Sequence, residues 1–423
     1  MLITVAFSKE HNMTTAIAGP TLADFIAARD VVSAVAQETP IEQSRYLSGI
    51  LGLEVVLKCE NLQRTGAYKI RGAYNRMSKL SPDERARGVV AASAGNHAQG
   101  VALAAQELGI QATIFMPMGV ALPKLLATKD YGAEVVLLGP TFTESLAAAK
   151  EFAEKTGAVF IPPYDHADVV AGQGTVGLEI FEQVADVETV IVPIGGGGLI
   201  SGVASAMKQH AAANGRTIRI IGVQSTNAAA YPPSLRAGEP TTIEMKPTIA
   251  DGIAVARPGT LNFAIIKDTV DEVVTVSDDD IARALVMLLE RAKLVVEPAG
   301  AVGVAAILAE KIDAVGKTVV ILSGGNIDPM VMERVIARGL VTTGRYMSMR
   351  IPLPDRPGQL ARISEILADL NANVVEVLHT RHGTDLQITQ VELEIHIETR
   401  GPEHAALVLD ALRADDYEPR VDF

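Results

Sequence analysis

The sequence contains no tryptophan, and aromatic residues make up only 4% of its 423 residues. A hydrophobic core must therefore be filled mainly by alanine, valine, isoleucine and leucine. Cys59 is the single cysteine, and one thiol can form neither an internal disulfide nor a cysteine-based metal site. Because 48% of the residues are hydrophobic, disordered, collagen-like and small disulfide-stabilised proteins are excluded.

Positive charge is also scarce, with 37 Lys and Arg against 50 Asp and Glu, a net charge of −13. This balance argues against nucleic acid or an anionic membrane as the main partner. No apolar run approaches the roughly 18 residues that a membrane-spanning helix needs. The apolar start at residues 1–7 is followed directly by charged residues, unlike a secretory signal. The sequence therefore predicts a cytoplasmic globular protein without a membrane or nucleic-acid partner.

Between residues 88 and 165, short apolar runs alternate with helix-like segments. Strands are expected at 88–92, 112–117, 134–139 and 158–162, and helices at 96–109, 121–132 and 141–157. Strands without polar alternation, separated by helices, are typical of a parallel sheet covered on both faces. The pattern restarts with strands at 189–195, 217–224 and 317–325, loops at 226–260, and a long helical stretch from Asp278 to residue 311. The sequence predicts an α/β body of two sheet lobes with a cleft between them.

After Gly344 the pattern changes. Residues 347–354 alternate like a half-exposed strand, and the order βαββαβ over roughly 75 residues predicts a ferredoxin-like α+β module. We therefore expect two domains, residues 1–345 and 346–423. The smaller lobe of the first covers about 88–165, and residues 1–20 form a loose extension.

Glycine-rich or polar turns fall where strands end and helices begin, the edge at which open parallel sheets bind ligands. Residues 195–198 are four consecutive glycines, whose backbone N–H groups can converge on an anion at the start of the next helix. They lack the lysine of a P-loop and the spacing of a dinucleotide fingerprint. A tight turn chosen for packing is the alternative. SGGN at 323–326 is a weaker indication of the same kind.

Two further segments carry reactive or polar side chains. Lys69 is flanked by Gly66, Ala67 and Gly72, small residues that leave room for a flat molecule. A desolvated lysine amine loses its charge readily and suits Schiff-base chemistry, although most lysines at a helix start are solvated. The turn SAGNHAQG at 93–100 suits a carboxylate held by backbone amides and hydroxyls, with plain helix capping as the alternative.

Together, and in this order, these segments resemble the fold-type II family of pyridoxal-phosphate enzymes, and within it the threonine/serine ammonia-lyases. The resemblance covers about residues 35–340. It includes TP at 39–40, TIADG at 248–252, EPAGA at 297–301, and Glu60 ahead of AYKIRG at 67–72. It implies a two-lobed catalytic body, similar to the tryptophan synthase β fold, that binds pyridoxal 5′-phosphate.

The resemblance implies a role for each matching residue. Lys69 would bind the cofactor and, once released from it, remove the α-proton of the substrate. Asn96 would bind the 3′ oxygen of the ring, Ser323 would bind the pyridine nitrogen, and Tyr68 would pack nearby. The phosphate would be held by Gly195, Gly196, Gly197, Gly198 and Leu199, and the substrate carboxylate by Ser93, Ala94, Gly95, Asn96 and His97.

The implied reaction is β-elimination. A neutral serine at the ring nitrogen gives a weaker electron sink than a carboxylate would, which suits elimination better than transamination. L-threonine or L-serine would give 2-oxobutanoate or pyruvate and ammonia, in amino-acid metabolism such as isoleucine biosynthesis. Serine racemase, threonine synthase and 3-hydroxyaspartate ammonia-lyase are alternatives within the family, and a non-catalytic amino-acid sensor is an alternative outside it.

Two departures from serine racemase bear on these alternatives. Ala94 stands where that enzyme has a serine on the opposite ring face, and a methyl group cannot transfer a proton. Gln224 stands at the first carboxylate of its divalent-cation site, and Ala228 and Ala230 follow. The sequence therefore predicts neither racemisation nor a metal site.

Residues 355–377, DRPGQLARISEILADLNANVVEV, resemble an ACT domain, an amino-acid-sensing fold. This implies a homodimer or homotetramer and an amino-acid effector, such as isoleucine or valine, bound between paired modules near Asp355, Gly358 and Asn373. A plain oligomerisation domain is the alternative.

Overall fold

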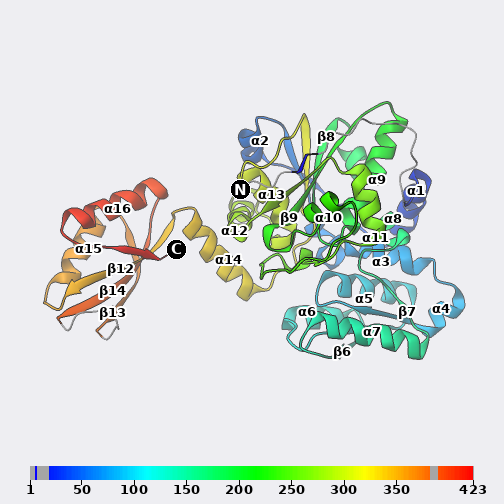
Figure 1. Ribbon diagram of the computed structural model, residues 1–423, viewed down its shortest axis with the longest axis horizontal. Helices are drawn as coiled ribbons and strands as arrows, with labels where there is room; N and C mark the ends of the chain where they lie inside the picture. The colour runs from blue at the N-terminus through cyan, green and yellow to red at the C-terminus, as the bar shows by residue number, and fades with distance from the viewer. Residues whose placement is uncertain (1–4, 7–18, 382–388, 423) are drawn as a thin grey trace. The chain divides into compact units, whose positions relative to one another are not determined.

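A computed structural model describes residues 5–6, 19–381 and 389–422 (Figure 1). Contacts divide the chain into two compact units, Met1–Pro329 and Met330–Phe423. Among the helices of the described ranges, none combines the length and apolar character that crossing a bilayer requires. The loose extension expected at residues 1–20 falls largely outside the described residues, and within it Val5–Ala6 pair with residues 272–273.

The larger sheet of the first unit is parallel except at its two edges. Its inner strands are rich in valine and isoleucine and buried on both faces, because helices cover both faces. In sheet order, its described strands are β1 (Val5–Ala6), β10 (Glu272–Val276), β9 (Arg219–Ser225), β8 (Val187–Pro193), β11 (Lys317–Ile321), β3 (Val55–Lys58) and β2 (Ile41–Gln43), with β1 and β2 antiparallel.

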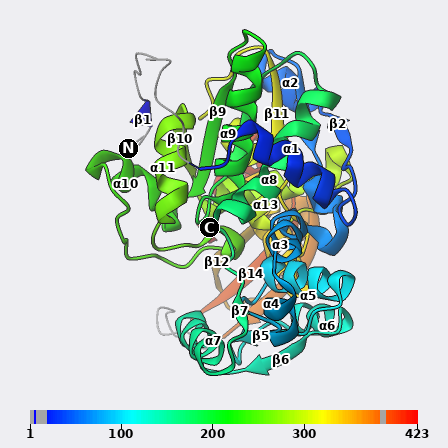
Figure 2. The same cartoon turned by 90° about the vertical axis from the view of Figure 1, so that its right-hand side faces the viewer.

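Helices on either side of this sheet pack it into a layered lobe (Figure 2). The α8–α9 crossing needs glycine, because a Cβ on Gly202 would lie 2.5 Å from the backbone nitrogen of Gly174. The helices of this lobe are α1 (Leu22–Val32), α2 (Arg45–Leu51), α8 (Ala167–Gln183), α9 (Gly198–Ala213), α10 (Tyr231–Ala237), α11 (Thr260–Thr269), α12 (Asp278–Met287) and α13 (Pro298–Leu308). Short turns of helix are η1 (Glu60–Leu62), η2 (Arg64–Gly66), η3 (Thr226–Ala228), η4 (Asp251–Ile253) and η5 (Leu288–Ala292).

The smaller lobe is a parallel sheet covered by helices, at the bottom of Figure 2. In sheet order, its described strands are β6 (Glu134–Leu137), β5 (Ala112–Met116), β4 (Val89–Ala92) and β7 (Val159–Phe160). Its helices are α4 (Pro82–Arg87), α5 (Asn96–Leu108), α6 (Leu122–Asp130) and α7 (Phe142–Thr156). Its core also includes Ile70, Ala73 and Met77 of α3 (Lys69–Ser78), so the helix that begins at Lys69 belongs to this lobe and also contacts α8. The predicted two-lobed α/β class is thus confirmed.

Two expected elements differ from the structure. The expected loop at 226–260 contains α10, because Pro232 and Pro233 are compatible with a first helical turn and Gly238 ends the helix in the left-handed region. The expected long helix from Asp278 breaks between η5 and α13. Lys293 has φ +61°, and the proline at 298 disfavours a helical conformation at the residue before it.

The second unit has the predicted βαββαβ order, and its antiparallel sheet runs β13-β14-β12-β15. Alternate residues of β12 and β14 are buried under two helices. Its described elements are α14 (Pro329–Thr342), β12 (Tyr346–Pro354), α15 (Gln359–Asp369), β13 (Asn373–Thr380), β14 (Gln390–Glu398), α16 (Pro402–Ala414) and β15 (Arg420–Asp422). The contact boundary at 329 precedes the expected 345, because α14 groups with this unit.

Candidate active site

The segment before Lys69 pairs with the turn that follows β11. Ala67 forms an isolated bridge with Gly324, and the backbone N–H of Tyr68 donates to the carbonyl of Ser323 over 3.3 Å. Lys69 begins α3, and its Nζ donates to the carbonyl of Pro163 over 3.0 Å and lies 5.1 Å from the centre of the Tyr68 ring. The structure thus places Ser323 next to Tyr68 and Lys69, although Ser323 is remote from them in sequence.

The four glycines at 195–198 form the turn between β8 and α9. The carbonyl of Gly196 accepts from the Tyr231 hydroxyl and the Asn262 amide, each over 3.1 Å. In the described part of the chain, no backbone N–H of residues 195–199 has an acceptor. Together with the N-terminus of the 16-residue helix α9, these free N–H groups make a site suited to a phosphate.

The glycine turn has no room for side chains. A Cβ on Gly196 would lie 2.4 Å from the Tyr164 ring, and one on Gly197, where φ is +103°, would lie 2.1 Å from the Tyr231 hydroxyl. Asp165 holds the neighbouring α11 by accepting from the N–H groups of residues 260–262. The segment 163–165 therefore supports both the glycine turn and Lys69, and nothing in the sequence marked it.

Residues 93–97 form the turn between β4 and α5. The Ser93 hydroxyl accepts from the N–H of Gly95 over 3.1 Å. Among the described residues, the N–H groups of Asn96 and His97 have no acceptor. Ser93, Ala94, Gly95 and Asn96 are partly exposed, so this turn can offer N–H groups to a substrate carboxylate.

The side chain of His97 does not face this turn. It is buried, and its Nε2 lies 2.9 Å from the carbonyl of Ile161. Burial lowers the pKa of His97 to about 3, and the positive charge of Lys69 adds to this effect. His97 is therefore neutral at physiological pH and supports the smaller lobe, so its part in a carboxylate site is limited to its backbone.

Asn96 and Ser323 approach the same place from opposite lobes. Asn96 begins α5 in the smaller lobe, and its amide contacts Glu297 and Asn326 of the larger lobe. Ser323 is buried after β11, and its hydroxyl makes no hydrogen bond within the described part of the chain. Glu297 and Asn326 lie in segments that the sequence pointed to, EPAGA and SGGN, but no role was predicted for either side chain.

An ion pair joins the lobes beside the 93–97 turn. Lys124 of α6 donates to Asp251 of η4 over 2.8 Å, and a Cβ on Gly95 would lie 4.0 Å from the Lys124 Nζ. Asp251 belongs to the TIADG segment, whereas Lys124 lies in no motif from which its role could be predicted. The pair places a second amine near the proposed carboxylate site.

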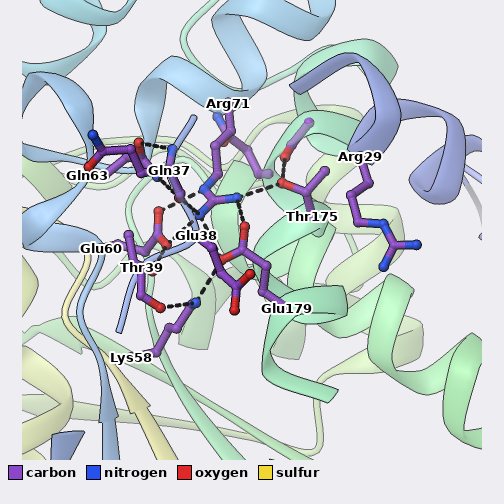
Figure 3. A network of polar contacts seen from close by, with 12 residues as sticks. Arg29, Gln37, Glu38, Thr39, Lys58, Glu60, Gln63, Arg71, Thr175 and Glu179 are labelled. Carbon is purple, nitrogen blue, oxygen red and sulfur yellow. Dashed lines mark hydrogen bonds and ion pairs between the residues drawn. The ribbon is translucent and has the colours of Figure 1, made fainter. Parts of the chain in front are cut away.

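A buried ionic network fixes the start of α3 (Figure 3). Arg71, which is 1% exposed, donates to both carboxylate oxygens of Glu60 over 2.9 Å, and it also binds Glu179 of α8. Lys58 donates to Glu179 over 2.7 Å. Burial acts to raise the pKa of Glu179, but Arg71 and Lys58 outweigh it and hold that pKa below its usual value. The network joins β3, η1, α3 and α8 two residues from Lys69.

Gln224, at the position where serine racemase has a metal ligand, has internal hydrogen-bond partners. Its side-chain oxygen accepts from the N–H of Tyr231 over 2.9 Å, and its nitrogen lies 3.4 Å from the carbonyls of Ile194 and Ala228. No cluster of three or more metal-ligating side chains occurs among residues 5–6, 19–381 and 389–422.

In the second unit, the expected effector residues are all exposed. Asp355 follows the end of β12 that pairs with Gln390, whereas Asn373 pairs with Glu398 at the other end of β14. At about 3.3 Å per strand residue, these ends are roughly 25 Å apart. Gly358 starts α15 on the Asp355 side. One module therefore does not bring the three residues together.

The residues of the first unit fit a phosphorylated ring aldehyde. The free N–H groups of the glycine turn suit its phosphate, the Lys69 amine suits its aldehyde, and the Ser323 hydroxyl and Asn96 amide can bind polar ring atoms. Gly196, Gly197 and Gly324 are enclosed by neighbouring protein atoms, so a side chain at any of them would displace the residues that form this site.

Comparisons with known proteins agree with this arrangement. Residues 32–324 match the family model "Pyridoxal-phosphate dependent enzyme", and residues 349–416 match "ACT domain". The chain is 48% identical to L-threonine ammonia-lyase of Thermotoga maritima over 95% of this chain and 99% of that protein. It is 48% identical to the catabolic L-threonine dehydratase TdcB of Escherichia coli K12 over 72% of this chain and 92% of that protein.

Solved structures show the same body. Threonine deaminase isoform 2 of Solanum lycopersicum, in its processed form, is 37% identical with a TM-score of 0.71, over 79% of this chain and 99% of that one. Maize serine racemase is 36% identical with a TM-score of 0.71, over 76% of this chain and 98% of that one. The chain therefore belongs to the family of pyridoxal-phosphate-dependent enzymes, uses pyridoxal 5′-phosphate as its cofactor, and carries a C-terminal ACT domain.

Proposed function

We propose that this enzyme is a lyase that converts L-threonine, and also L-serine, to a 2-oxo acid and ammonia. The observation that carries the proposal is the convergence of Lys69, Asn96 and Ser323 at one place beside the free N–H groups of residues 195–199. The likeness to L-threonine ammonia-lyase over 95% of the chain, including the second unit, supports the choice of substrate.

The bound cofactor supplies an electron sink for the α-carbon of the substrate. The protein residues bind the cofactor and the substrate and move the proton. The Lys69 amine binds the cofactor and, once released, takes the α-proton. The N–H groups of Asn96 and His97 hold the substrate carboxylate and so orient the α-carbon. The glycine turn holds the phosphate, and the neutral Ser323 hydroxyl binds the ring nitrogen without giving it a full positive charge.

Ala94 favours elimination over racemisation. Racemisation needs a second acid on the ring face opposite Lys69, and Ala94, in the partly exposed 93–97 turn, carries no proton to give. The likeness to maize serine racemase concerns the shared body and does not supply that group.

Product analysis tests this proposal. The enzyme is supplied with L-threonine, L-serine or 3-hydroxyaspartate, and the 2-oxo acid, ammonia and the D-enantiomer are measured. We expect equimolar 2-oxobutanoate and ammonia from L-threonine, pyruvate and ammonia from L-serine, and no D-serine. D-serine formed faster than pyruvate would instead identify a racemase, and a preference for 3-hydroxyaspartate would change the substrate.

The second unit supports regulation by an amino acid in a homodimer or homotetramer. All of β13, at the edge of its sheet, is exposed, including Val374, Val375, Val377 and Leu378. An exposed apolar edge strand is suited to pairing with another chain. Two antiparallel copies would bring Asp355 and Gly358 of one module toward Asn373 of the other, which one module alone does not do.

In this proposal the catalytic domain spans residues 1–345, the regulatory domain spans 346–423, and the enzyme is cytoplasmic.

A further inference from the structure

The side-chain amide of Asn96 accepts one hydrogen bond through its oxygen and donates another through its nitrogen. Its Oδ1 accepts from Asn326 Nδ2 over 2.9 Å, and its Nδ2 donates to Glu297 Oε1 over 2.6 Å. An amide nitrogen carries two N–H groups. Within the described residues, the second N–H of Asn96 has no partner.

The ends of this chain of hydrogen bonds fix the orientation of every amide in it. Asn326 Nδ2 also donates to the carbonyl of Thr65 over 2.6 Å, and a carbonyl can only accept. Asn326 must therefore present its nitrogen to Asn96, and Asn96 must present its oxygen to Asn326. At the other end, the Glu297 carboxylate can only accept when it is ionised, and the nitrogen of Asn96 then faces it.

The fold places Glu297 in this position from two sides. Its backbone N–H donates to the carbonyl of Gly324 over 2.9 Å, and it precedes Pro298 at the start of α13. A Cβ on Gly324 would lie 2.3 Å from Glu297 Oε1 and 3.1 Å from Asn96 Nδ2. Glycine at 324 thus leaves the space in which the carboxylate meets the amide.

We propose that Glu297 is a positioning residue that fixes the amide of Asn96 so that its remaining N–H is presented to the cofactor. The inference rests on the proposed function, and it takes from the family resemblance the binding of the cofactor ring oxygen by the Asn96 amide. Glu297 itself touches Asn96 and the Gly324 turn and acts through Asn96.

The charge of Glu297 is sensitive to its surroundings. Burial raises the pKa of its carboxyl to about 7, and the charge of Asp251 on η4 adds to the rise. Lys124 on α6, the hydrogen bond from Asn96 on α5, and Lys69 on α3 oppose it. Glu297 therefore changes charge near neutral pH, next to the amide that it orients.

The test measures the cofactor dissociation constant of full-length variants rather than their activity. Glu297→Ala removes the acceptor, and because a hydrogen bond to a charged group is worth about 1.5–3 kcal/mol, we expect cofactor binding to weaken roughly tenfold or more. Glu297→Gln keeps an acceptor oxygen and should stay within about threefold of the natural protein at pH 8. Glu272→Gln and Glu272→Ala are the matched controls, because Glu272 is also buried, also has a raised pKa, and pairs with Arg219 rather than Asn96.

A pH series separates positioning from general stability. Only the natural side chain changes charge, so the ratio of the dissociation constants of Glu297→Gln and the natural protein should change by about threefold or more between pH 6 and pH 8. The corresponding ratio of cofactor dissociation constants for Glu272→Gln and the natural protein should stay constant between pH 6 and pH 8. A constant Glu297→Gln ratio, or Glu297→Ala binding as tight as the natural protein, would overturn the inference, and if Glu297→Ala does not fold, the Glu297→Gln series decides alone. Failure of the natural protein to bind the cofactor or convert L-threonine would instead overturn the proposed function.

Discussion

At the scale of single residues, the sequence pointed to the groups whose chemistry is unusual, and it missed the groups that hold them. Lys69 stood out because small residues flank its amine, and residues 195–198 stood out because four consecutive glycines follow a strand and precede a helix. Glu297, Asn326 and Lys124 did not stand out as side chains. Their roles depend on contacts between segments up to 230 positions apart, which local patterns do not contain.

His97 is another residue whose surroundings the sequence did not predict, and its burial predicts how stability depends on pH. Its place in the SAGNH turn suggested a substrate contact, yet its ring is buried against Ile161 with a pKa of about 3. Because the pKa is lower in the folded state than in the unfolded state, the unfolded state takes up the proton first as pH falls. The neutral histidine therefore stabilises the fold above about pH 6.5, and this stability is lost as pH falls toward 3.

The variant His97→Gln removes this titration. The difference in free energy of unfolding between the natural protein and His97→Gln should shrink by about 1.4 kcal/mol for each pH unit below 6.5. Urea unfolding at pH 7.5, 5.5 and 4.5 measures this difference. A difference that stays constant over that range would show that His97 takes up its proton as readily in the folded protein as in the unfolded one.

At the scale of elements, strands and helices of the first unit were predictable because buried parallel strands have no polar alternation. The errors came where tertiary context decides. The helix α10 occupies an expected loop because its prolines fall in the first turn and Tyr231 is buried beside the glycine turn. The break before α13 places Glu297 at a helix start, which a continuous helix from Asp278 would not do.

The α3–α8 contact gives a prediction at this scale. Glu179→Ala on α8 leaves Arg71 buried with one of its two carboxylate partners gone (Figure 3). Breaking a buried ion pair costs about 3–5 kcal/mol, so we expect a loss of that order in the free energy of unfolding. Glu182→Ala is the control, because Glu182 lies on the same helix in an exposed pair with Arg29, and such pairs contribute about 0–1 kcal/mol.

Urea unfolding of both variants measures the two losses. Equal losses for Glu179→Ala and Glu182→Ala would mean that the network in Figure 3 does not stabilise the start of α3. The expected large difference would instead tie the helix that carries Lys69 to α8 through Arg71.

At the scale of the whole molecule, the change of pattern after Gly344 predicted a second unit with its own core, and the structure has one. Sequence pattern alone could not place its effector residues relative to one another. Asp355 and Asn373 lie at opposite ends of β14, so an effector that touches both must bind between two copies.

Removal of residues 346–423 tests this regulation. We expect the truncated enzyme to convert L-threonine and to lose its response to isoleucine or valine. In the full-length enzyme, a coupling of about 1–3 kcal/mol would change the half-saturating threonine concentration roughly 5- to 150-fold. Asn373→Ala in the full-length chain is the matched variant, because it removes one side of the proposed site and keeps the fold of the module. If no amino acid shifts the full-length curve, the second unit serves assembly alone.

The proposal that the Lys69 amine binds the cofactor can be tested chemically. Borohydride reduction of the holoenzyme fixes the cofactor to the amine that holds it, and peptide mass analysis then identifies the lysine. We predict one labelled peptide, containing Lys69, and loss of the visible absorption band of the bound cofactor on reduction. Lys124, the other amine beside the 93–97 turn, provides the internal comparison. Labelling of Lys124, or of no lysine at all, would show that Lys69 does not bind the cofactor.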